Sequence, residues 1–251
     1  MGFKDHFSGH AGDYARHRPT YPAELFTWLA ALAPRHERAW DCGTGNGQAA
    51  RGLAGHFAQV IATDASAQQI AAAEPAPRIE FRVAPAENSG LPDASVDLVT
   101  VGQALHWFDL DAFYAEARRV LRPGGAIAAW AYALTRVTPE IDAAVLRFYE
   151  EVVGPYWPFE RRHVESGYRT LPFPFDELAD TPSLCVSADW DRAAFCAYLR
   201  TWSAAKRFEE ACGFDPVDAF EQELAAAWGD RGTVRRVSWP IAIRAGRAAR
   251  S

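Results

Sequence analysis

Short apolar runs alternate with segments of helical spacing along the first half of the chain. The runs with strand character are residues 38–41, 59–63, 79–83, 96–101 and 126–130. Apolar residues at helical spacing follow Pro22 and recur at 111–121, and Ser66 can cap a helix between the second and third runs. This alternation predicts an α/β fold built on a doubly wound sheet with mostly parallel strands and right-handed crossovers.

The second half of the chain departs from this pattern. Residues 135–180 are rich in aromatic residues and proline, and we interpret them as an insertion that caps the functional site. Residues 184–188 and 237–244 predict two further strands joined by helical segments, so the complete sheet is expected to have seven strands. Residues 1–21 are predicted to form an N-terminal arm. We therefore expect residues 1–251 to form one Rossmann-like domain.

Composition narrows the functional classes. The chain has 251 residues and is 49% hydrophobic, which is enough for a sizeable core. Its formal net charge of −6 disfavours binding to a nucleic-acid backbone, so no nucleic-acid partner is expected. The 4 cysteines lack the spacing and histidine partners of a metal site, so no metal is expected. Neither a signal peptide nor a stretch long enough to span a membrane is visible, which predicts a cytoplasmic protein.

The segment from Asp41 to Gly47 reads D-C-G-T-G-N-G and joins the first predicted strand to a helix. Glycine tolerates positive φ in such a turn and lets a ligand approach the backbone, while the helix start adds unpaired N–H groups. The dinucleotide fingerprint G-x-G-x-x-G is spaced differently, because here the third glycine comes one residue early. The segment therefore predicts a loop that binds an adenosine-bearing ligand.

Acidic residues follow the next two predicted strands. Asp64 ends the second strand, where a carboxylate can accept hydrogen bonds from ribose hydroxyls; the alternative is an acid that stabilises a helix N-terminus. Glu87 follows the third strand and can accept from an adenine amino group while the Ala86 N–H donates to a ring nitrogen, unless Glu87 is only a solvated loop acid. Asp41 is predicted as part of the ligand-binding site, where orienting the glycine loop through backbone N–H groups is favoured over direct contact with the ligand.

Together these residues resemble the class I methyltransferases that use S-adenosylmethionine, whose motif is D-x-G-x-G-x-G. The stretches that resemble the methyltransferase type 11 family are the glycine loop, Asp64 and residues 91–93, 96–99 and 121–125. Residues 14–22 and 103–108 are most similar to the trans-aconitate methyltransferase-like branch. The resemblance covers residues 10–135 and the remainder only by general plan.

The resemblance implies S-adenosylmethionine as cofactor and S-adenosylhomocysteine as product. The residues at which it implies cofactor contact are Tyr14, Arg18, Gly43, Gly45, Asp64, Glu87, Gln103 and Ala104, and the Ala86 N–H is expected beside Glu87. Gln103 and Ala104 are expected along the methionyl side, with Gly43 and Gly45. Tyr14 and Arg18 are expected to reach the cofactor's carboxylate, for which a bidentate guanidinium is well suited.

Methyl transfer from a sulfonium is an in-line displacement, so positioning the acceptor and excluding water supply much of the acceleration. A carboxylate acceptor needs no base, whereas a hydroxyl or ammonium does; His106 is the candidate base, or else a packed residue of the cleft wall. The candidate acceptor-binding residues are Trp107, Tyr156, Trp157, Arg161 and Arg169. Their aromatic and cationic character predicts a small, acidic and partly apolar acceptor.

Two alternative functions stay open at this point. A non-catalytic protein that binds S-adenosylmethionine or its product has the same loop, because no single residue is obligatory for methyl transfer. A nicotinamide-dependent oxidoreductase has the same sheet but is disfavoured by the glycine spacing. The protein is expected to be a monomer or a homodimer.

Overall fold

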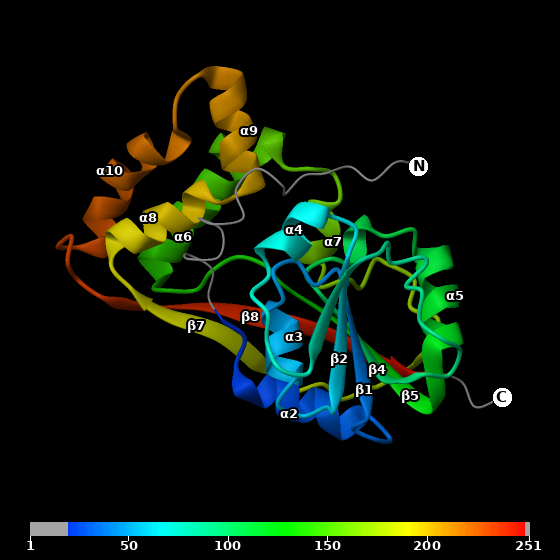
Figure 1. Cartoon of the computed structure of the whole chain (residues 1–251). Helices are drawn as coiled ribbons and strands as arrows, with labels where there is room; N and C mark the ends of the chain where they lie inside the picture. Colours follow the sequence, from blue (N-terminus) through cyan, green and yellow to red (C-terminus); the bar gives the residue numbers. More distant parts are fainter. Residues whose placement is uncertain (1–19, 249–251) are drawn as a thin grey trace.

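The computed structural model describes residues 20–248, which contain a single sheet (Figure 1). Its strands are β1 (Arg38–Cys42), β2 (Gln59–Asp64), β3 (Ile79–Val83), β4 (Val96–Gly102), β5 (Leu121–Tyr132), β6 (Asp176–Glu177), β7 (Leu184–Trp190) and β8 (Arg235–Arg247). Strands β1 to β5 are parallel, in the order β3-β2-β1-β4-β5. Strand β8 lies antiparallel beside β5, and its other edge pairs with β6 and β7. The predicted doubly wound, mostly parallel sheet is confirmed, with the short β6 as an additional strand.

Helices pack on both faces of this sheet. They are α2 (Ala23–Leu32), α3 (Gln48–Leu53), α4 (Ala67–Ala72), η1 (Leu105–Trp107), α5 (Leu110–Val120), α6 (Pro139–Arg147), η2 (Phe148–Val152), η3 (Gly154–Tyr156), α7 (Arg161–Glu165), α8 (Arg192–Arg200), α9 (Ser203–Cys212) and α10 (Pro216–Trp228). Ser66 accepts a hydrogen bond from the Gln69 N–H at the start of α4, and Asp109 accepts one from the Ala112 N–H at the start of α5. Short polar side chains thus begin these helices, as predicted for Ser66. None of the helices among residues 20–248 is long and apolar enough to cross a membrane.

Strand β5 is longer than the sequence predicts. It begins at Leu121, directly after α5, and not at residue 126. Leu121 pairs with Val96, and the register between β4 and β5 shifts between Val96 and Leu98. Pro123 lies in this irregular part, where a strand tolerates a residue without a backbone N–H. The Pro-Gly-Gly segment therefore belongs to the strand and does not separate it from the helix.

A helical lobe stands beside the sheet and consists of α6, η2, η3, α8, α9 and α10 (Figure 1). It is assembled from two segments, one between β5 and β6 and one between β7 and β8. Phe148 of the first segment stacks on Phe220 of the second, with ring centroids 4.5 Å apart. The aromatic-rich segment at 135–180 thus supplies part of this lobe, and the helices predicted only as connectors supply the rest.

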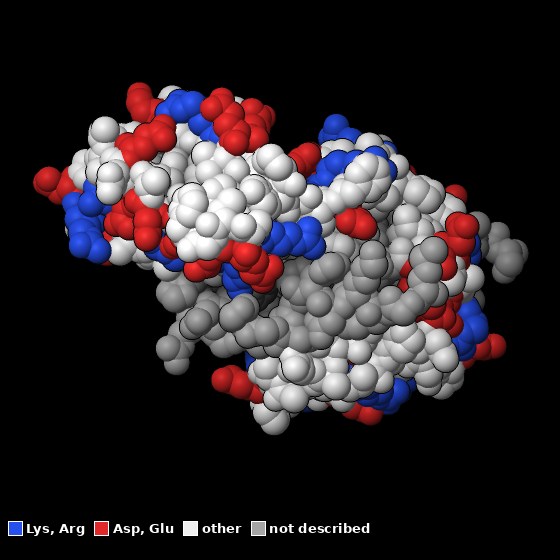
Figure 2. All heavy atoms as spheres, turned by 90° about the horizontal axis from the view of Figure 1, so that it is seen from above, with Lys and Arg blue, Asp and Glu red and all other residues white. Residues whose placement is uncertain are grey.

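Charges of both signs are interspersed on the molecular surface. Figure 2 shows the molecule from above, with acidic and basic side chains mixed over the helical lobe and over the sheet domain beside it. Several of these charges are paired, such as Arg147 with Glu223 between α6 and α10. Neither the acidic nor the basic side chains form a continuous patch over the part of this face that is not drawn in grey.

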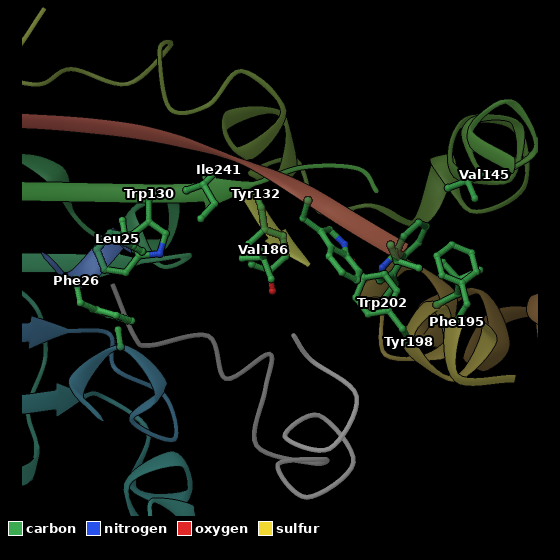
Figure 3. Close-up of a cluster of buried hydrophobic side chains, with 14 of the residues drawn as sticks. Leu25, Phe26, Trp130, Tyr132, Val145, Val186, Phe195, Tyr198, Trp202 and Ile241 are labelled. Carbon is green, nitrogen blue, oxygen red and sulfur yellow. The ribbon is translucent and has the colours of Figure 1, made fainter. Parts of the chain in front are cut away.

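One hydrophobic cluster connects the sheet with the helical lobe. It begins at Leu25 and Phe26 of α2, continues through Trp130 of β5 and reaches Phe195 and Trp202 in the lobe (Figure 3). A second cluster fills the opposite face of the sheet, against α5. Because the first cluster is continuous, the lobe is packed in a defined position relative to the strands.

Candidate functional site

The glycine loop follows β1 and leads into α3. Gly43, Gly45 and Gly47 all have positive φ, at +68°, +57° and +87°. A Cβ on Gly43 would lie 2.6 Å from the Cβ of Ala104, and one on Gly47 would lie 2.6 Å from the ring of Phe81. Both distances are far below van der Waals contact, so these positions require glycine for close packing as well as for backbone conformation.

Asp64 connects this loop to the end of β2. One carboxylate oxygen accepts a hydrogen bond from the Gly45 N–H at 2.9 Å, and the other accepts one from the Ser66 N–H at 2.9 Å. Asp64 therefore fixes the glycine loop at the carboxyl end of β2.

Asp41 lies beneath the loop and is buried. Its carboxylate accepts hydrogen bonds from the hydroxyls of Thr44 at 2.5 Å and Thr100 at 2.9 Å. Burial raises its pKa to about 6, although both hydroxyls oppose that shift. Asp41 thus links the loop to β4 mainly through threonine hydroxyls, and the roles of Thr44 and Thr100 were not predicted from the sequence.

Ala86 and Glu87 lie on the loop after β3. Ala86 is buried in the second cluster, and Glu87 accepts a hydrogen bond from the Asp109 N–H at 3.0 Å. The same loop is held by Glu116 of α5, which accepts hydrogen bonds from the N–H and the hydroxyl of Ser89. Glu87 is therefore held where the loop meets the start of α5.

The end of β4 lies against the glycine loop. Gln103 has a positive φ of 61°, and its N–H donates to the Trp130 carbonyl at 2.9 Å. Ala104 follows and packs against Gly43. The structure thus brings the ends of β1, β2 and β4 together, and this edge is where open parallel sheets bind their ligands.

His106 follows on η1, which packs against α7. Its Nδ1 lies 3.1 Å from the hydroxyl of Tyr168, a completely buried residue. Burial, with help from the positive charge of Arg161 and from His163, lowers the His106 pKa to about 3. The imidazole is therefore neutral at physiological pH.

Arg161 of α7 is held by aromatic side chains. Its Nε donates to the hydroxyl of Tyr149 at 2.9 Å, and that hydroxyl donates to Glu165. Its guanidinium lies over the ring of Trp157, 4.7 Å from the centroid. Cation–π contact and a hydrogen bond thus fix one face and one edge of the guanidinium. The role of Tyr149 was not predicted, because its partner Arg161 lies 12 positions further along the chain.

The other predicted acceptor-binding residues have different surroundings. Trp107 packs beside His106, with ring centroids 4.6 Å apart. Tyr156 packs on Phe208 and contacts the thiol of Cys212, so it belongs to the packing of the helical lobe. Arg169 is exposed.

Two predicted cofactor contacts, Tyr14 and Arg18, lie outside the described residues, as does nearly all of the predicted arm. Within residues 20–248, no group of His, Cys, Asp and Glu is arranged to hold a metal ion.

Comparison with known proteins gives consistent matches. A family model described as a methyltransferase domain matches residues 40–129, which include the glycine loop and the ends of β2, β3 and β4. A Dictyostelium discoideum protein assigned as a methyltransferase is 33% identical over 230 residues, covering 90% of this chain and 87% of that protein. An uncharacterized methyltransferase of Mycobacterium tuberculosis is 30% identical over 193 residues, covering 72% of this chain and 78% of that protein. The solved structure of an Anaeromyxobacter dehalogenans protein assigned as a type II methyltransferase is 53% identical, with a TM-score of 0.87, and covers 92% of this chain and 97% of that one.

Proposed function

Because the chain belongs to the class I methyltransferases that use S-adenosylmethionine, we propose that it methylates the carboxylate of a small organic acid. The cofactor is S-adenosylmethionine, and the product formed from it is S-adenosylhomocysteine. The acceptor class is our inference from the residues around His106 and Arg161. The similarity to the trans-aconitate branch stays a prediction that agrees with this acceptor class.

The residues at the ends of the strands fit this cofactor. The glycines of the loop have positive φ, and glycine lets a ligand such as the methionyl chain approach the backbone without a Cβ in the way. Asp64 would accept from the ribose hydroxyls, and Glu87 would accept from the adenine amino group, with the Ala86 N–H beside it. Carboxylates at these strand ends are suited to such contacts.

An unpartnered donor near the same edge supports this fit. The indole Nε1 of Trp130 is buried without a hydrogen-bond partner. It lies 3.3 Å from the position that a Cβ on Gly102 would occupy, at the end of β4. Buried N–H groups are costly without an acceptor, and the carboxylate of a methionyl group is one that would satisfy it.

The observation that carries the acceptor class is the fixed guanidinium of Arg161. Arg161 lies close enough to His106 to lower its pKa, so its charge acts just beyond the end of β4. A planar guanidinium matches a carboxylate in shape and charge, and Trp157 and Tyr149 hold it ready. This arrangement supports an acceptor that carries a carboxylate.

A carboxylate acceptor also simplifies the chemistry. One carboxylate oxygen supplies the electron pair for the new bond to the methyl carbon, while the bond from that carbon to sulfur breaks. The electron pair of the broken bond stays on sulfur, which becomes the neutral thioether of S-adenosylhomocysteine. No proton is transferred, so the protein needs to position the two reactants and exclude water.

An acceptor screen with two matched arginine variants tests this function. Di- and tricarboxylates, amines and phenols are offered with S-adenosylmethionine, and methyl esters are expected as the products. Arg161→Gln should raise KM for the reactive acid about 10- to 100-fold, because it removes a charge-assisted contact. Arg162→Gln is the control, because Arg162 is exposed and stacks on the exposed Phe159.

Titration with S-adenosylmethionine separates the possible failures. Both arginine variants should bind the cofactor as the wild-type protein does, since neither lies at the glycine loop. Reaction of amines or phenols alone would overturn the acid acceptor. Tight cofactor binding with no methylated product would favour a non-catalytic binding protein.

A further inference from the structure

Tyr168, the partner of His106, has a strained backbone. Its φ is +65°, a region that bulky residues rarely adopt. The conformation is held from both sides, since the Tyr168 N–H donates to the His163 carbonyl at 2.7 Å and the Tyr168 carbonyl accepts from Arg244 at 2.9 Å. Strain of this kind persists only where the surroundings impose it, and it is concentrated at functional sites. Here it directs the phenol ring into the core beneath η1.

Within residues 20–248, the phenol hydroxyl has two hydrogen-bonding neighbours. A backbone hydrogen bond from Leu105 reaches its oxygen and favours the phenolate form, as an N–H donor does. The other neighbour is His106 Nδ1 at 3.1 Å. A phenol has one proton to donate, and in this buried place Nδ1 is the acceptor for it. Nδ1 must then be unprotonated, which places the single proton of the neutral imidazole on Nε2.

The surroundings of His106 keep the imidazole neutral. Burial is the largest cause of its lowered pKa, and Arg161 and His163 of α7 both act in the same direction. Tyr168 presents an uncharged phenol, because burial raises its own pKa far above the usual value. The ring is therefore a neutral donor at Nε2 and is held by Tyr168 at Nδ1.

We propose that Tyr168 holds His106 as the Nε2–H tautomer, so that His106 donates a hydrogen bond to the acceptor and takes no proton from it. Tyr168 is then a positioning residue, and His106 with Arg161 forms a pair of donors for one carboxylate. One carboxylate oxygen is held by these donors while the other faces the methyl group. The acceptor in this proposal rests on the proposed function, whereas the tautomer of His106 does not.

Nuclear magnetic resonance reads the tautomer without any acceptor. In protein labelled with ¹⁵N-histidine, correlations between ring protons and ring nitrogens distinguish bare from protonated nitrogen, and His106→Gln identifies the His106 signals. We expect a protonated Nε2 and a bare Nδ1 from about pH 5 to about pH 9, although a free imidazole titrates near 6.5. A protonated Nδ1, or an imidazolium in this range, would overturn the proposal.

Two tyrosine variants test the origin of the tautomer. Tyr168→Phe should mix the two tautomers, because Nδ1 loses its donor. Tyr114→Phe is the matched control, since Tyr114 is buried in the same cluster but donates to the Pro172 carbonyl. If the Tyr168→Phe variant is folded, as judged from its spectrum, and the tautomer of His106 is unchanged, Tyr168 does not set that tautomer.

Kinetics of His106 variants test the role of the donor. His106→Gln keeps an N–H donor and should retain activity within about tenfold of wild type, whereas His106→Ala should lose about 10- to 100-fold. A general base would be worth about 10²- to 10⁴-fold, and glutamine could not replace it. Equal loss in both variants would therefore refute the donor role. If no acid is methylated by the wild type, the proposed function fails and the spectroscopic result still decides the tautomer.

Discussion

At the residue scale, Asp41 places a titratable carboxyl group beneath the glycine loop, where it is shielded from solvent. Its carboxylate is buried, and its hydrogen-bond partners include the hydroxyls of Thr44 and Thr100 and the Ala50 backbone. Hydroxyl donors stabilise a buried carboxylate only in part, so burial dominates and the pKa rises to about 6. Asp41 therefore changes charge close to neutral pH, directly beneath the glycine loop.

This raised pKa predicts how stability depends on pH. The folded pKa of about 6 exceeds the value of about 3.9 in unfolded chains, so the contribution of Asp41 is full below about pH 4 and is lost as pH rises through 6. Asp41→Asn removes this loss. Between pH 4.5 and pH 7.5, the wild type should lose about 2 kcal/mol of unfolding free energy more than the variant does. Urea unfolding at the two pH values measures it, and identical pH dependence in both proteins would show that Asp41 does not titrate there.

At the element scale, the loop after β1 and the turn after β4 fit together through Gly43. A Gly43→Ala methyl group would meet Ala104 at 2.6 Å and Phe108 at 3.1 Å, so the two connections would have to separate. Because both connections line the proposed methionyl site, the change should affect stability and cofactor binding together.

Gly124 provides the control for Gly43→Ala. Gly124 also has positive φ, at +78°, but nothing lies within 4 Å of the position of its Cβ. Gly124→Ala should cost only the backbone strain of about 1–2 kcal/mol, and Gly43→Ala should cost about 1–3 kcal/mol more from overpacking. Urea unfolding measures both costs, and calorimetric titration should show weaker S-adenosylmethionine binding in Gly43→Ala alone. Equal costs and equal affinities would show that the contact with Ala104 is not restrictive.

Elements with a local signature were predictable from the sequence. The periodicity of apolar residues and the cap at Ser66 identified β1 to β4 and the start of α4, because these signals lie within the element itself. The early start of β5 was missed, since pairing between Leu121 and Val96 overrides the Pro-Gly-Gly signal. The helical lobe was recognised only in part, because two distant segments build it.

The residues of the candidate site were likewise predictable only where their signal is local in the sequence. The glycine loop and Asp64 were identifiable because their spacing in the sequence reflects one continuous turn. The pairing of His106 with Tyr168 joins residues 62 positions apart, and that of Asp41 with Thr100 joins residues 59 positions apart. Nothing in a single sequence specifies such partners, because tertiary packing selects them.

At the scale of the whole molecule, the sheet and the helical lobe share one hydrophobic cluster. The rings of Tyr132 in β5 and Trp239 in β8 pack with their centroids 6.5 Å apart, and the centroids of Trp239 and Tyr198 of α8 are 5.2 Å apart. The indole N–H of Trp239 also donates to the Tyr198 hydroxyl at 3.0 Å. Since no polar layer separates the lobe from the sheet along this path, both parts are expected to unfold in one transition.

Removing one ring from the lobe tests this coupling. Phe148 is 1% exposed and stacks on Phe220, so Phe148→Ala should destabilise the protein by about 3–5 kcal/mol. Leu146→Ala lies in the neighbouring α6 at a position 43% exposed, and it should change stability by about 0.5 kcal/mol or less. Hydrogen exchange should then show protection falling together in α8, α10 and the parallel strands of the Phe148→Ala variant, because the continuous cluster transmits the loss. If the helices lose protection while β1 to β4 keep theirs, the lobe is a separate cooperative unit that can open without the sheet.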